Sequence, residues 1–131
     1  METTPAIPFK KFRLAIVWFI VVLILICVPG NDLPKVDDWF QKINADKLIH
    51  VGIFGLLAFL FFRPIAQSSF SKKEKIIYLL KIAMATSIWG LTTEFIQRFY
   101  IPGRSFDLLD WLADSIGGVA AFVWGRWKMI K

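Results

Sequence analysis

Four long apolar segments limit the possible folds of this chain more than any other feature. They lie near residues 12–29, 46–63, 75–97 and 107–127. The hydrocarbon core of a bilayer is about 30 Å thick, so a helix crosses it in about 20 residues. Each segment is apolar on every side rather than on one face, which argues against a soluble amphipathic bundle. We therefore predict an all-α fold, with four transmembrane helices in an antiparallel bundle that forms a single domain over residues 1–131.

Composition supports the membrane class. The chain is 56% hydrophobic and 20% charged, far from the average of soluble domains. Its formal net charge is +6, but the basic residues form short clusters at the segment ends, so we do not expect nucleic acid as a partner. Residues 10–28 imitate a signal peptide, yet the following ICVPGND lacks small residues for cleavage, which favours an uncleaved anchor helix. The single cysteine, Cys27, excludes a disulfide within the chain.

The distribution of Lys and Arg predicts an orientation, because cytoplasmic loops retain an excess of basic residues. Ten basic residues lie in 1–13, 63–75 and 126–131, against five in 30–47 and 98–104. We therefore expect both termini in the cytoplasm. On the opposite side, VDDWFQKI at 36–43 has its apolar residues at helical spacing. This segment is expected to be either a short helix on the membrane surface or a lid.

Polar side chains of three predicted helices fall at one depth, near the extracytoplasmic face. Glu94 lies about 28 Å along its helix from Lys75, and His50 is one turn inside Asp46. A charge inside a bilayer is costly, so such residues face the bundle interior and pair with one another. We expect the following residues to face inward as one cluster: Asp46, His50, Glu94, Gln97, Asp107, Asp110 and Asp114.

A stripe on the last predicted helix supports this orientation. Asp110 and Asp114 share one helical face with Gly118, Ala121 and Gly125. Small residues at this spacing let a neighbouring helix approach closely. The acids are therefore expected on the packing face of the helix.

The chemistry of these residue types predicts a catalytic or ligand-binding site. His50 could act as general acid or base, with Glu94, Asp110 and Asp114 as its partners or as oxygen ligands for a divalent cation, Mg²⁺ or Ca²⁺. Arg104, in the PGRS turn, suits an anionic head group, and the neighbouring Ser105 is a weak candidate nucleophile.

Each of several candidates also has a purely structural interpretation. Asp46 could cap the second predicted helix, and either Asp107 or Ser105 could cap the fourth. Arg104 could simply pair with Asp107 at the surface. These alternatives remain open from the sequence.

Four short motifs in this order resemble the VanZ-like family of small bacterial membrane proteins. They are DKLIH at 46–50, EFIQ at 94–97, PGR at 102–104 and D-x-x-D-x-x-x-[polar]-x-x-G from Asp107 to Gly117. The resemblance implies a multi-pass helical protein of the bacterial cytoplasmic membrane. It also implies a link to lowered susceptibility to the glycopeptide teicoplanin, with which the name-giving member is associated. The matching polar positions are Asp46, Lys47, His50, Glu94, Gln97, Arg104, Asp107 and Asp110.

One position departs from the family pattern. Where the family typically has Asn, this chain has Asp114. The extra carboxyl group either strengthens a preference for a cation or stays protonated.

Two functions from different classes follow. In the first, the cluster binds or modifies an envelope lipid or a lipid-linked wall precursor at the outer leaflet, as a membrane-embedded hydrolase or transferase if it is an enzyme. In the second, the chain is a non-catalytic binding or assembly protein whose cluster only orders the bundle. Four helices in 131 residues leave little room for an enclosed cavity, which favours a dimer, as a possible homo-oligomer, or a shallow site. Ion transport fits less well, because Lys81 is the only ionisable residue in the predicted cytoplasmic half of the helices.

Overall fold

The computed structural model describes residues 6–29 and 45–131, and most of these residues are helical. Within these ranges the elements are the 3-10 helix η1 and four α-helices, with the bounds η1 Phe9–Phe12, α1 Arg13–Ile26, α3 Ala45–Ala66, α4 Lys72–Tyr100 and α5 Leu108–Lys128. The described part of the chain contains no strand, which confirms the predicted all-helical class. Among the helices of the described residues, α3, α4 and α5 are long and apolar enough to cross a membrane. The expected surface helix or lid at 36–43 lies outside the described residues.

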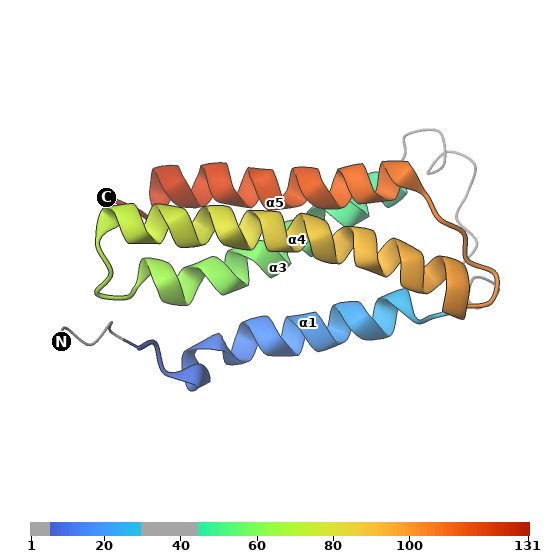
Figure 1. Ribbon diagram of the computed structural model, residues 1–131, viewed down its shortest axis with the longest axis horizontal. Helices are drawn as coiled ribbons and strands as arrows, with labels where there is room; N and C mark the ends of the chain where they lie inside the picture. The colour runs from blue at the N-terminus through green and yellow to red at the C-terminus, as the bar shows by residue number, and fades with distance from the viewer. Residues whose placement is uncertain (1–5, 30–44) are drawn as a thin grey trace.

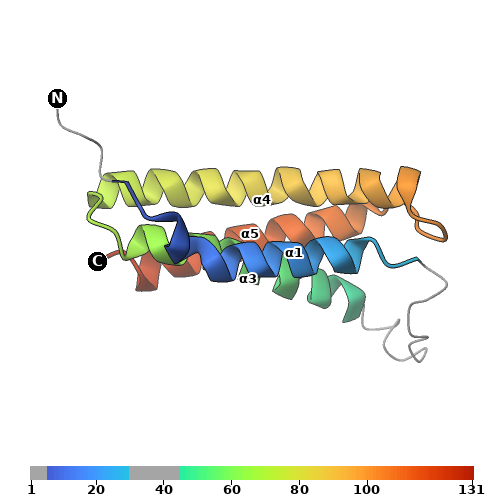
Figure 2. The same cartoon turned by 90° about the horizontal axis from the view of Figure 1, so that it is seen from below.

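The helices lie side by side along one long axis, and successive helices run in opposite directions (Figure 1). One end of the molecule holds η1, the α3–α4 turn and the C-terminal end of α5. The other end holds the beginning of α3 and the α4–α5 loop. Viewed from below, α1 overlies α3, while α4 forms one edge (Figure 2). Residues that lie far apart in the sequence therefore meet at each end.

Two apolar clusters fill the interior. One joins α3, α4 and α5 and consists of Ala58, Phe62, Ile65, Leu79, Ala121 and Ile130. The other joins α1 to α3 and consists of Val22, Ile26, Phe54 and Leu57. The outer surface also carries many large apolar side chains, such as Ile88, which is 65% exposed. Apolar surface on this scale fits a lipid environment.

The helix boundaries differ from the sequence-based prediction at two Pro residues. α1 ends at Ile26, three residues before Pro29 and earlier than the predicted 29, since a Pro disfavours helical geometry in the residue before it. The predicted end of the second segment at residue 63 is wrong, because α3 continues through Pro64 to Ala66. Pro64 cannot donate a backbone hydrogen bond to the Leu60 carbonyl oxygen, and the helix continues for only two residues beyond it.

α4 begins at Lys72 rather than at the predicted 75, because of a capping box. The Ser71 hydroxyl accepts a hydrogen bond from the Glu74 backbone N–H at 3.2 Å. The Ser71 backbone N–H donates in return to the Glu74 carboxylate at 2.7 Å. These two bonds satisfy N–H groups that a helix start otherwise leaves unpaired.

The packing face of α5 holds it close to both neighbours. The expected stripe is buried at Asp114, Gly118, Ala121 and Gly125. The tightest approach is at Gly117, where a side-chain carbon would lie 2.5 Å from the Val51 carbonyl oxygen and 2.8 Å from the Gly55 backbone nitrogen. Both obstacles are backbone atoms of α3. The spacing between α3 and α5 thus depends on the absence of a side chain at position 117.

We expect Gly117→Ala to destabilise the protein by about 1–3 kcal/mol, because α5 must move away from α3 to accommodate the methyl group. Gly52→Ala is the matched control, since a side-chain carbon at Gly52 meets nothing within 4 Å. The control should gain up to about 1 kcal/mol from the higher helix propensity of Ala. Unfolding in detergent, followed by circular dichroism, measures both changes. Equal effects of the two substitutions would contradict the conclusion that Gly117 sets the spacing between α3 and α5.

Candidate functional site

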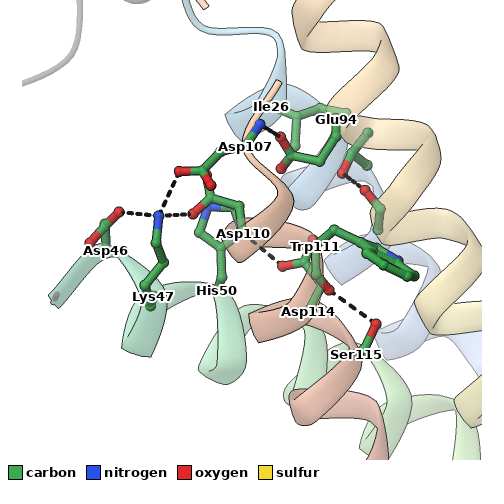
Figure 3. A network of polar contacts seen from close by, with 12 residues as sticks. Ile26, Asp46, Lys47, His50, Glu94, Asp107, Asp110, Trp111, Asp114 and Ser115 are labelled. Atoms are coloured by element: carbon green, nitrogen blue, oxygen red, sulfur yellow. Dashed lines mark hydrogen bonds and ion pairs between the residues drawn. The ribbon is translucent and has the colours of Figure 1, made fainter. Parts of the chain in front are cut away.

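Seven polar residues gather where the beginnings of α3 and α5 meet the far end of α4 (Figure 3). We call this group the polar cluster. Its members are Asp46, Lys47, His50, Glu94, Asp107, Asp110 and Asp114. Five of the seven side chains are carboxyl groups. The cluster therefore combines three helices and an excess of acids at one end of the bundle.

Lys47 forms three ion pairs in the outer part of the cluster. Its Nζ lies 2.9 Å from Asp46 Oδ2, 2.8 Å from Asp107 Oδ2 and 2.5 Å from Asp110 Oδ1. Hydrogen bonds between charged groups are stronger than neutral ones. One cation on α3 thereby holds the first turn of α5, and it neutralises part of the acidic charge.

His50 lies deeper, between two acids of α5. Its Nδ1 is 2.7 Å from Asp114 Oδ1, and its Nε2 is 3.5 Å from Asp110 Oδ2. An ionised Asp114 can only accept, so Nδ1 then carries the proton and a neutral ring presents the lone pair of Nε2 toward Asp110. Asp114 thus fixes both the orientation of the imidazole and the nitrogen available for chemistry.

Glu94 is fully buried, with 0% of the residue exposed. Its Oε2 accepts a hydrogen bond from the Asp107 backbone N–H at 3.0 Å, which ties α4 to the beginning of α5. Its Oε1 has no hydrogen-bond partner among the described residues, and neither has Oδ2 of the equally buried Asp114. Unpaired carboxylate oxygens are costly away from water. Both oxygens are therefore positioned to take up a proton or a cation.

The residues whose potential ligand atoms converge are His50, Glu94 and Asp110. One atom from each lies within 4.8 Å of the others. The predicted ligand set contained Asp114 in place of His50, whereas in the structure Asp114 faces the Nδ1 nitrogen of His50. A carboxylate behind a histidine is the usual arrangement around metal-bound imidazole, where it orients the ring and raises its basicity.

Asp107 is the N-cap of α5. Its Oδ1 accepts a hydrogen bond from the Leu109 backbone N–H at 2.9 Å, while Oδ2 pairs with Lys47. Of the two proposed caps, the structure thus selects Asp107 over Ser105. Asp46 lies in the first turn of α3, where an acid is favourable, and its contact in the cluster is Lys47.

Three predicted site residues lie apart from the cluster. Gln97 is buried and donates through Nε2 to the carbonyl oxygen of Ile26 at 3.3 Å, at the end of α1. Arg104 lies in the α4–α5 loop, and within the described residues it forms no ion pair with Asp107 and its buried Nε has no partner. Ser105 is exposed in the same loop. None of the three contacts the cluster through a hydrogen bond in the described part of the chain.

Gly90 is a part of the site that the sequence analysis missed. A side-chain carbon there would lie 2.8 Å from Asp114 Cβ and 2.9 Å from Asp114 Oδ2. The missing side chain therefore makes room for the buried acid. A signal was available, because Gly90 is one helical turn before Glu94 and so shares its face.

Two further polar contacts lie beside the cluster. The hydroxyls of Ser87 and Ser115 are 2.7 Å apart, and the Trp111 indole donates to the Ser87 carbonyl oxygen at 3.0 Å. Both contacts join α4 to α5. They fix the relative rotation of the two helices that carry Glu94 and Asp114.

The fold and the cluster define a multi-pass helical membrane protein with an acidic site at one end of its bundle. The chain belongs to the VanZ/LLP1 family, whose family model matches residues 6–128. This match confirms the resemblance seen in the four motifs. Comparisons with curated proteins and with solved structures gave no match.

The pair between Asp107 and Lys47 makes stability depend on pH. The hydrogen bond from Lys47 holds the pKa of the Asp107 carboxyl below its ordinary value of 3.8, despite some desolvation. A lowered pKa means that the folded state favours the ionised form. The stabilisation is fully present above the ordinary pKa, and it is lost as the pH falls below 3.8 through the lowered value.

We expect Asp107→Asn to be less stable than the parent protein at neutral pH, because Asn keeps the cap but removes the charge facing Lys47. The difference should shrink below about pH 4 as the parent carboxyl is protonated. Asp107→Ala should lose about 1 kcal/mol more than Asp107→Asn at every pH, since Ala cannot cap. Thermal unfolding in detergent between about pH 3 and pH 7 gives all three curves. A parent–Asn difference that does not vary with pH would refute the ion-pair contribution.

Proposed function

We propose that the chain crosses the bacterial cytoplasmic membrane four times, as an antiparallel bundle and a single domain over residues 1–131, with both termini in the cytoplasm. The support is the position of the charges. Basic residues of η1, of the α3–α4 turn and of the end of α5 lie at one end of the molecule (Figure 1). Cytoplasmic ends of membrane helices are enriched in Lys and Arg. The polar cluster then faces the extracytoplasmic side.

We further propose that the polar cluster binds a divalent cation through His50, Glu94 and Asp110, and with it the phosphate group of an envelope lipid or a lipid-linked wall precursor. One observation carries this proposal. Three ligand atoms from α3, α4 and α5 converge within 4.8 Å beside an unpartnered Glu94 oxygen. Mg²⁺ and Ca²⁺ take oxygen ligands and commonly bridge carboxylates to phosphates. A site at one end of a membrane bundle lies at the depth of lipid head groups.

The charge of the cluster supports the same conclusion. Five carboxyl groups share a small volume with Lys47 and His50, and Lys47 contacts only the outer three, Asp46, Asp107 and Asp110. Of the two inner acids, Asp114 pairs with His50, and Glu94 forms no ion pair within the described residues. A bound cation would offset the inner negative charge, and the additional acid at position 114 strengthens that demand.

In an enzymatic form of this proposal, the protein is a membrane-embedded hydrolase or transferase. The cation would polarise the phosphate group. Asp114 would keep the His50 ring oriented and basic. Arg104, in the α4–α5 loop, would attract the anionic head group. Action on a wall precursor would connect the protein with glycopeptide susceptibility, as the resemblance to the teicoplanin-associated member implies.

A second function is favoured by the contacts of Lys47. They link α3 directly to the cap and first turn of α5. On this account the cluster orders the bundle of a non-catalytic binding or assembly protein. The two accounts differ in what happens when the charge is removed but the shape is kept.

We expect His50→Gln and Glu94→Gln to weaken binding of Mg²⁺, Ca²⁺ or Mn²⁺ by about tenfold or more, because loss of even a residue that supports a metal ligand costs about 10–100-fold in metal affinity. Both proteins should still fold, because Gln preserves polarity and approximate size. Glu74→Gln is the matched control, as it makes the same change at the opposite end of α4. Calorimetric titration of each purified protein measures affinity, and circular dichroism measures folding.

The outcomes separate the two functions. Weaker cation binding by a folded protein supports the cation site, and loss of glycopeptide resistance in cells carrying the same variant supports the wall-precursor role. Unfolding of both variants, with no cation binding by the parent, supports the structural role. Unchanged binding in both variants rules out the proposed ligands.

The orientation is tested by two matched substitutions in a Cys27→Ala background. Ser105→Cys lies in the exposed α4–α5 loop and Ser69→Cys in the exposed α3–α4 turn. We expect a membrane-impermeant maleimide added to intact cells to label position 105 and to reach position 69 only after lysis. The reverse pattern would place the cluster on the cytoplasmic side.

A further inference from the structure

Residues of η1, of the beginning of α1 and of the last turns of α3 line a basic cavity. These segments lie at the end of the molecule opposite the beginnings of α3 and α5, where the polar cluster is found (Figure 2). The cavity has a volume of about 410 Å³, and its cationic lining residues are Lys10, Lys11, Arg13 and Arg63. Small-molecule sites typically measure about 300–1,000 Å³. The cavity is thus large enough for a phosphate-bearing head group.

Its positive charge is not offset by acids in the described structure. Within residues 6–29 and 45–131, no ion pair involves any of the four cationic residues. Neither η1 nor α1 has an acid in its first turn. The acid nearest to Arg63 in the sequence, Glu74, is held in the capping box with Ser71. Four like charges around one space repel each other, and an anion between them would relieve that repulsion.

The cavity also has an apolar side. Leu14 and Leu60 line it together with the basic residues, and Leu14 is 61% exposed. Lys and Arg near the ends of membrane helices extend their charged groups toward the head groups while their stems lie along apolar surface. Such a combination fits a molecule with an anionic head and apolar chains.

We propose that the basic cavity binds the phosphate-bearing head group of an anionic membrane lipid, with the lipid chains running along Leu14 and Leu60. The lipid belongs to the leaflet opposite the polar cluster. Basic residues at the membrane surface attract anionic lipids in this way. This site shares no residue with the proposed cation site and does not depend on its function.

Matched triple substitutions test the proposal. The cavity triple is Lys10→Gln, Lys11→Gln and Arg63→Gln. The control triple is Lys72→Gln, Lys73→Gln and Arg126→Gln, which removes the same two lysines and one arginine from exposed positions at the same end without touching the cavity lining. The full-length protein in uncharged detergent is titrated with short-chain phosphatidylglycerol, and the apparent Kd is read from the shift in thermal unfolding.

We expect the cavity triple to raise the apparent Kd for phosphatidylglycerol about tenfold or more, and the control triple less than about twofold. Arg63→Gln alone, a milder change at an exposed position, should raise it about threefold. Phosphatidylcholine and sn-glycerol 3-phosphate should bind at least about tenfold more weakly than phosphatidylglycerol to the parent protein. Phosphatidylcholine tests the need for a net negative charge on the head group. sn-Glycerol 3-phosphate tests the need for the lipid chains.

Three results would overturn the proposal. Equal weakening by both triples would mean diffuse surface charge rather than a site. Equal affinity for phosphatidylcholine would remove the role of the anion, and equal affinity for sn-glycerol 3-phosphate would remove the role of the lipid chains.

Discussion

The close approach of α5 to α3 is the contact on which the rest of the structure depends. It occurs where Gly117 meets the backbone of Val51 and Gly55. This spacing brings Asp110 and Asp114 on α5 within reach of Lys47 and His50 on α3. A wider separation would leave the acids of α5 without their basic partners in a surrounding that does not solvate charge. Helix packing and charge pairing are thus two aspects of one arrangement.

The basic partner of the carboxylates changes along the bundle. Lys47 forms ion pairs with the outer carboxylates at the helix ends, where water is near. His50 serves the inner one, Asp114, which is fully buried. In the described part of the chain, the hydrogen bond that Glu94 forms is with a backbone N–H, on one of its two oxygens, and Glu94 is also fully buried. The carboxyl groups thus have fewer basic partners toward the inside of the bundle. The potential ligand atoms of His50, Glu94 and Asp110 converge in that region.

The sequence was sufficient to predict the helical class and the family, and it placed His50, Glu94 and the α5 acids at one level of the bundle, where the structure brings them together. These follow from segment length and helical rise, which depend little on side-chain detail. The central role of Lys47 could not be predicted, because a long flexible side chain can reach several partners and its choice depends on the packed geometry. The same holds for Gln97, which has the right depth but faces the end of α1. The exchange of Asp114 for His50 among the converging atoms depends on side-chain rotamers that the sequence does not specify.

Helix boundaries show a similar division. The capping box of Ser71 and Glu74 can be recognised from the local sequence. The hydrophobic pattern alone, however, placed the beginning of α4 three residues late. The continuation of α3 through Pro64 is a tertiary effect, since Ile65 beyond it belongs to the apolar core. Burial there offsets the hydrogen bond that Pro cannot donate.

The contact between Gly90 and Asp114 has a consequence for how this site can evolve. A side chain at position 90 would collide first with Cβ of residue 114, an atom that Asp and Asn have in common. Exchange between these two residues therefore leaves the collision unchanged, and the site can gain or lose a charge without any change on α4. Replacement of Gly90, in contrast, requires either Gly at position 114 or a shift of α5 away from α4. The charge at position 114 can thus change without any effect on this contact, whereas a side chain at position 90 changes the spacing of the two helices.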